Sequence, residues 1–121
     1  MSGTAELAMV TIDCADPQAL ARFYAALLGR EVAHSEEQYA MVDGAGGAPL
    51  GFGKVDDYRA PQWPNPEGTK QFHLDLRVDD LDKAEALCLE LGATRPDFQP
   101  GETWRVLLDP SGHPFCICPR H

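Results

Sequence analysis

The pattern that decides the fold lies in residues 72–80, which read Phe72-His73-Leu74-Asp75-Leu76-Arg77-Val78-Asp79-Asp80. Apolar residues at 74, 76 and 78 alternate with polar ones, which is the period of a strand with one buried face. A helical pattern begins at Asp80 directly afterwards. The same order of alternating residues, aspartate and helix occurs 64 residues earlier, in residues 9–16. The chain therefore contains a duplicated unit.

The first copy is predicted to span residues 7–55. A strand over residues 8–14 leads into a helix that Asp16 caps and Pro17 opens, because the first helical turn does not use the N–H that proline lacks. Gly29 is expected to end this helix. Three further strands are predicted over residues 31–34, 38–42 and 50–55.

A proline-rich connector over residues 56–70 leads to the second copy, residues 71–119. Its helix is capped by Asp80, buries Leu87 and Cys88 and stops at Gly92. Strands are predicted over residues 71–78, 94–99, 103–108 and 115–118. The predicted fold class is α+β, with two tandem βαβββ modules inside one domain of residues 1–121.

Composition and charge limit the function. A chain of 121 residues, 44% of them hydrophobic, forms one domain, whereas half of it would be marginal alone. A net charge of −9 argues against binding to nucleic acid or an anionic membrane, since phosphates would be repelled. No apolar run is long enough to span a bilayer, and no leader pattern is seen, so we expect a soluble cytoplasmic protein.

The two modules resemble the glyoxalase/bleomycin-resistance/dioxygenase superfamily, also called vicinal oxygen chelate proteins. The resemblance covers residues 7–119, and Trp63-Pro64 is typical of the small glyoxalase-like subgroup. It implies that the modules form a shared cleft and that the protein is a homodimer, but not which reaction it performs. Three stretches carry the resemblance: Phe23-Tyr24 with Leu28-Gly29, Val78-Asp79-Asp80-Leu81, and Asp109-Pro110-Ser111-Gly112-His113-Pro114-Phe115.

Strand alternation predicts which side chains line that cleft. The apolar residues of the first strand face its helix, which leaves Thr11 and Asp13 toward the cleft. Asp13 and Arg77 occupy repeat-related positions, so they can pair with each other or contact a ligand. The other residues predicted to face the cleft are Met9, Gly51, Gly53, His73, Asp75, Cys116 and Cys118.

Metal-dependent members of the superfamily place ligands at positions that correspond to Met9, Gly51, His73 and Cys116. Only His73 is an ordinary ligand there, and an open metal site needs about three protein ligands. We therefore expect no metal and no other cofactor. A zinc ion that recruits His113, Cys118 or His121 is the alternative.

His73 beside Asp75 is a candidate general base, because imidazole titrates near neutral pH and a carboxylate orients it. The simpler interpretation is a cleft histidine bonded to its neighbour. Cys116 as a nucleophile is disfavoured, since no helix N-terminus is near enough to lower a thiol pKa.

The cleft predicts a ligand of modest size. Gly51 and Gly53 remove side chains from its floor; the alternative explanation is strand bulging or close backbone approach to the other module. Trp63 and Trp104 offer flat surfaces for stacking, or pack in the core. With the acidic balance, these features favour a metal-free protein that binds a small neutral or cationic organic molecule. The alternatives are a lyase, isomerase or dioxygenase using His73, and an interaction protein with a filled cleft.

Overall fold

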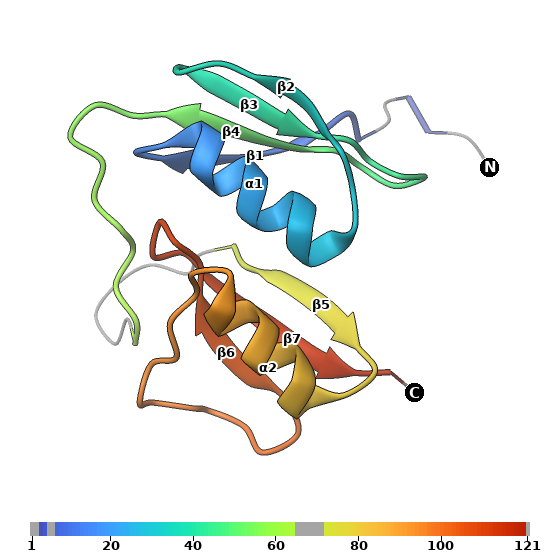
Figure 1. Cartoon of the computed structure of the whole chain (residues 1–121), viewed down its shortest axis with the longest axis vertical. Coiled ribbons are helices and arrows are strands. Elements are labelled where there is room, and N and C mark those ends of the chain that lie inside the picture. Colours follow the sequence, from blue (N-terminus) through green and yellow to red (C-terminus); the bar gives the residue numbers. More distant parts are fainter. Residues whose placement is uncertain (1–2, 5–6, 65–71, 121) are drawn as a thin grey trace. The chain divides into compact units, whose positions relative to one another are not determined.

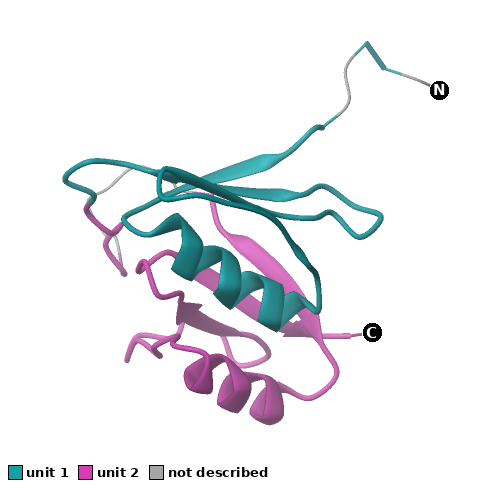
Figure 2. Cartoon of the chain, turned by 45° about the horizontal axis from the view of Figure 1, so that its top comes forward, with its two compact units in different colours: residues 1–58 teal, residues 59–121 magenta. Residues whose placement is uncertain are grey.

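The computed structural model describes residues 3–4, 7–64 and 72–120. The chain forms two compact units, residues 1–58 and 59–121 (Figure 2). The predicted α+β class is confirmed, because each unit contains one helix along one face of its own sheet (Figure 1). The elements are β1 (Val10–Cys14), α1 (Pro17–Leu28), β2 (Val32–Ser35), β3 (Tyr39–Val42), β4 (Leu50–Lys54), β5 (Leu74–Val78), α2 (Leu81–Glu90), β6 (Arg105–Leu108) and β7 (Pro114–Pro119).

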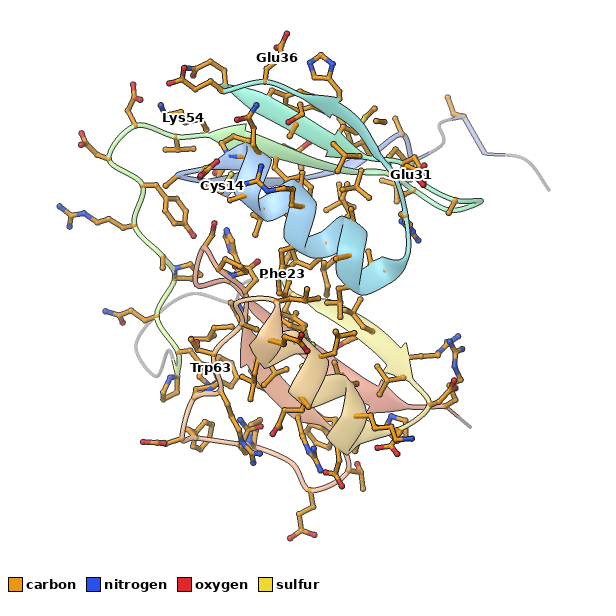
Figure 3. The ribbon with its side chains drawn as sticks, viewed as in Figure 1. Cys14, Phe23, Glu31, Glu36, Lys54 and Trp63 are labelled. Carbon is orange, nitrogen blue, oxygen red and sulfur yellow. The ribbon has the colours of Figure 1, made fainter. Side chains whose placement is uncertain are left out.

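The first unit has a four-stranded sheet in the order β1-β4-β3-β2, in which β1 runs parallel to β4. Helix α1 starts as predicted, since the Asp16 carboxylate accepts a hydrogen bond from the Ala19 N–H at 3.2 Å. It ends at Gly29, whose φ of 65° suits glycine. The Tyr24 ring stacks on Phe52 of β4 with ring centroids 5.6 Å apart, which joins helix to sheet. Phe23, labelled on α1 in Figure 3, is also buried.

The second unit has a three-stranded sheet in the order β5-β7-β6, with β5 parallel to β7. Helix α2 is capped by Asp80 as predicted, but Cys88 is its only buried residue. The predicted burial of Leu87 is wrong, because its side chain is 42% exposed. Ion pairs add to this limited packing: Arg105 of β6 contacts Asp82 at 2.7 Å and Glu85 at 3.6 Å.

The predicted strand over residues 94–99 is also wrong. Only a single bridge between Thr94 and Leu108 forms there. Pro96 and Pro100 cannot donate the backbone hydrogen bonds that a strand needs. The Gln99 side chain replaces the strand: its Nε2 donates to the Val106 carbonyl at 2.9 Å, and its Oε1 accepts from the Val106 N–H at 2.9 Å. Module two is therefore βαββ, with an amide side chain in the place of a strand.

No helix in the described part of the chain is long and apolar enough to cross a bilayer.

Removing the Gln99 side chain is expected to destabilise the second unit. Gln99→Ala leaves both backbone groups of Val106 without their partners on the edge of β6, which costs about 1–3 kcal/mol. Urea unfolding followed by circular dichroism measures the change. Gln62→Ala, at an exposed position of the same unit, is the matched control, and equal midpoints for the two variants would contradict the role of Gln99.

Candidate functional site

The candidate site is a cluster of three side chains in the second unit: His73, Asp75 and Cys116. His73 Nε2 lies 3.2 Å from Asp75 Oδ1, and the imidazole, carboxylate and thiol each place one ligand atom within 4.8 Å of the others. The His73 and Asp75 side chains are 47% and 65% exposed, whereas Cys116 is buried. The site therefore has an accessible polar pair above a buried thiol.

Strand geometry explains why these residues meet. His73 immediately precedes β5, and residues two apart on a strand lie on the same face, so its side chain reaches Asp75. The parallel register of β5 and β7 places Asp75 directly opposite Cys116. Alternation alone predicted that all three share a face, but not that Asp75 and Cys116 are neighbours.

The His73–Asp75 contact has a chemical consequence. A carboxylate beside Nε2 favours a proton on that nitrogen, which leaves Nδ1 of a neutral imidazole as a hydrogen-bond acceptor. An acceptor that is half exposed can bind a ligand N–H or O–H, or take up a proton.

The Cys116 thiol is held in its protonated form. Burial, the charge of Asp75 and the neighbouring Cys118 raise its pKa from 9.0 to about 11, as does its hydrogen bond to the Asp75 carboxylate. Burial and the charge of Asp75 also raise the pKa of Cys118, although Arg77 opposes them. Because a thiolate is the nucleophilic form, this environment counts against Cys116 as a nucleophile.

The first unit has different residues at the positions equivalent to this cluster, and the Tyr39 side chain contacts them. Met9 and Gly51 stand where His73 and Cys116 stand in the second unit, and Thr11 pairs with Gly51 as Asp75 pairs with Cys116. The Tyr39 hydroxyl donates a hydrogen bond to Met9 Sδ at 3.1 Å. Gly51 has no side-chain atom that could bind a metal, and the Met9 sulfur already accepts the hydrogen bond from Tyr39. These residues therefore do not fit the superfamily's metal-binding pattern.

The glycines of β4 differ in their surroundings. A Cβ at Gly51 would lie 2.9 Å from both Met9 Sδ and Tyr39 Oη and 3.1 Å from Thr11 Oγ1. The space above Gly51 is thus filled by side chains of its own unit rather than left as a floor. At Gly53 the nearest such atom is Thr11 Cγ2 at 4.0 Å, so a Cβ would fit there, and the predicted role of this position in a ligand cleft stays a prediction.

Both tryptophans have contacts within the second unit. Trp63 Nε1 donates to the Phe98 carbonyl at 3.2 Å, and the Trp63 and Phe98 rings lie 6.1 Å apart. Trp104 lies so close to Gly101 that a side chain there would overlap its ring. Each tryptophan therefore contacts residues of its own unit, although Trp104 is 38% exposed, and the stacking of either ring on a ligand stays a prediction.

The remaining predicted residues divide by location. Asp13 and Arg77 are exposed in different units, so their pairing stays a prediction, as does the shared cleft. The buried Asp109 carboxylate organises the turn before β7, because it accepts hydrogen bonds from the backbone N–H groups of Ser111 at 2.8 Å and His113 at 3.0 Å. His121 lies outside the described residues.

The fold and this site define a small α+β protein with a duplicated strand–helix unit. The chain belongs to the glyoxalase-like domain family, which it matches over residues 9–118, and the predicted superfamily is confirmed. It is similar to a glyoxalase/bleomycin resistance protein/dioxygenase family enzyme from Burkholderia phytofirmans PsJN, with 27% identity, a TM-score of 0.69, and coverage of 95% of this chain and 98% of that one. No curated protein sequence matches the chain.

Two further solved structures share the fold at lower identity. One is the oxidase ChaP-H2, with 24% identity, a TM-score of 0.67, and coverage of 98% of this chain and 96% of that one. The other is a lactoylglutathione lyase from Agrobacterium tumefaciens, with 16% identity, a TM-score of 0.62, and the same two coverages. An oxidase and a lyase on one fold show that this architecture does not determine the reaction.

The two glycines of β4 provide a paired test of the closed first unit. Gly51→Ala should separate the Tyr39 hydroxyl from Met9 and cost about 1 kcal/mol, since one hydrogen bond is lost and flexible side chains shift. Gly53→Ala should stay within about 0.5 kcal/mol, because nothing obstructs it. Neither glycine has a positive φ, so backbone strain does not confuse the comparison. Equal free energies of unfolding for Gly51→Ala and Gly53→Ala would contradict the close packing described around Gly51.

Alkylation of Cys116 should be slow at neutral pH and accelerate about tenfold per pH unit toward its pKa of about 11. Iodoacetamide labelling of a Cys118→Ser background, read by peptide mass spectrometry, isolates Cys116, since Cys14 and Cys88 are fully buried. Asp75→Asn removes a negative charge that raises the pKa, so it should speed labelling at pH 8. A rate that is flat between pH 7 and pH 9 would show an already ionised thiol.

Proposed function

We propose that this protein binds a small neutral or cationic organic molecule through His73 and Asp75, without the superfamily's complete metal site. The observation that carries the proposal is the His73–Asp75 contact of 3.2 Å in two side chains that are both about half exposed or more. A half-exposed acceptor nitrogen beside a carboxylate is suited to a ligand that donates hydrogen bonds.

The electrostatics favour the proposed ligand class. Asp75 contributes a negative charge at the site, and the chain as a whole carries −9. An anionic ligand would be repelled by both, whereas a protonated amine would gain a contact with the carboxylate. Since Asp75 is exposed, one such contact contributes about 0–1 kcal/mol. The affinity for a simple amine is therefore expected to be weak. The charge of Asp75 makes the site prefer a cationic ligand to an anionic one, but it adds little binding free energy.

The same contact supports a second candidate function, a lyase, isomerase or dioxygenase in which His73 acts as a general base. In a proton-abstraction step, Nδ1 would take a proton from a carbon beside a carbonyl, and Asp75 would stabilise the resulting imidazolium. Binding without turnover separates the first candidate from the second.

Three probes of one shape and different charge test the ligand class: benzylamine, benzyl alcohol and benzoate. Benzylamine and benzyl alcohol should shift the backbone amide NMR signals of residues 73–77 and 115–118, and benzoate should not. Asp75→Asn should weaken benzylamine about two- to fivefold and leave benzyl alcohol unchanged, as expected for one exposed charge. Asp97→Asn, at an exposed position of the same unit, is the control. Preferential binding of benzoate would overturn the proposal.

Deuterium exchange at the α-carbon of dihydroxyacetone tests the second candidate. If His73 is a base, the protein should accelerate exchange, and His73→Gln should remove an effect of about 10²- to 10⁴-fold. Exchange at the buffer rate in the wild type would leave binding alone as the function.

A further inference from the structure

The sheet of the second unit has one face that helix α2 does not cover. Arg105 of β6 contacts α2 through its ion pair with Asp82, and its register partner on β7 is Ile117. These residues therefore lie on the covered face. Because side chains alternate along a strand, Cys116 and Cys118 of β7 lie on the opposite, uncovered face.

Two opposite charges lie on this uncovered face. The parallel register of β5 and β7 sets Asp75 opposite Cys116 and Arg77 opposite Cys118. Residues two apart on a strand are roughly 6.6 Å apart along it, which sets the spacing between the carboxylate and the base of the arginine side chain. Burial raises the pKa of Cys118, Asp75 raises it further and Arg77 lowers it, so both charges act on this one thiol.

The Arg77 guanidinium is available to a ligand. Arg77 is exposed and makes no ion pair with any residue that the structure describes. The two carboxylates that flank it along β5 have other partners, because Asp75 contacts His73 and Asp79 contacts Arg120 at 2.8 Å. A guanidinium offers a fork of N–H donors that matches a carboxylate, so an acidic ligand group is its natural partner.

The floor between the two charges is uncharged. Burial and the charge of Asp75 raise the pKa of Cys116 to about 11, so its thiol is protonated at neutral pH. A reduced cysteine packs as a small apolar residue. A short methylene chain can therefore lie over the thiols of β7 and join a positive group at Asp75 to a negative group at Arg77.

We infer that the site selects a dipolar ligand of the ω-amino acid class, with its ammonium group on Asp75 and its carboxylate on Arg77. Such a ligand has no net charge, so this inference rests on the proposed function and narrows it to a ligand class. Arg77 is the added specificity residue. A plain amine would leave Arg77 without a partner, and a plain acid would meet the charge of Asp75 without compensation.

NMR titrations of the full chain at low ionic strength test the inference with δ-aminovalerate, pentylamine and valerate, which have the same number of carbons and differ in their charged end groups. δ-Aminovalerate should bind about two- to fivefold more tightly than pentylamine, as expected for one additional exposed ion pair, and valerate should bind most weakly. Arg77→Gln should abolish the preference for δ-aminovalerate. Lys83→Gln removes the same charge from an exposed position of α2 and should preserve that preference.

The inference and the proposed function can fail separately. Binding of pentylamine with no gain for δ-aminovalerate would overturn the inference and leave the proposed function intact. A preference for δ-aminovalerate that persists in Arg77→Gln, or that is lost in Lys83→Gln, would also overturn it. Tighter binding of valerate than of pentylamine would contradict the proposed function and, with it, the inference. Circular dichroism verifies that each variant is folded.

Discussion

Parallel pairing of the first and last strand in each unit is the constraint on which the site depends. A parallel pair cannot be joined by a tight turn, so the chain must cross over, and the helix and the remaining strands lie within that crossover. In the first unit this sets Thr11 opposite Gly51, and in the second it sets Asp75 opposite Cys116. Residues about 40 positions apart in sequence thus become neighbours, in the same register in both units.

One register carries two different sets of residues. In the first unit the equivalent positions hold a thioether, a threonine and a glycine, and the Tyr39 hydroxyl closes them by its hydrogen bond to Met9. In the second unit the same backbone presents three donors, two of them accessible. The duplicated scaffold is therefore conserved in geometry between its halves but not in chemistry. Within this register, the combination of an imidazole, a carboxylate and a thiol occurs in the second unit.

Much of the scaffold could be predicted from the sequence, because local rules determine it. The aspartate caps at Asp16 and Asp80 and the glycine stop at Gly29 depend on residues within one turn of the helix end. Strand period likewise placed His73 and Asp75 on one face. The predictions that were wrong depend on residues far apart in sequence. Helical spacing does not say how much of a helix its neighbours cover, so it could not show that Leu87 is exposed. Nor could a local pattern show that the Gln99 side chain bonds to Val106 where a strand was expected.

The candidate site likewise combines features that local sequence predicts with features that depend on contacts between distant residues. Alternation predicts a shared face, but strand register is a tertiary property, so the contact between Asp75 and Cys116 could not be read from the sequence. Gly51 was equally ambiguous, since a glycine on a strand signals either open volume or close approach. In the structure the space beside Gly51 is filled by the side chains of Met9 and Tyr39 of the same unit, which neither interpretation foresaw.

The protonation state of the His73 ring tests the account most directly, because the carboxylate contact organises the whole cluster. Long-range proton–nitrogen NMR spectra at pH 8, assigned by comparison with His73→Gln, distinguish the two neutral tautomers. We predict a proton on Nε2 and a bare Nδ1 in the wild type, and a mixture of tautomers in Asp75→Asn. A proton on Nδ1 in the wild type, or identical spectra for the two proteins, would contradict the arrangement described.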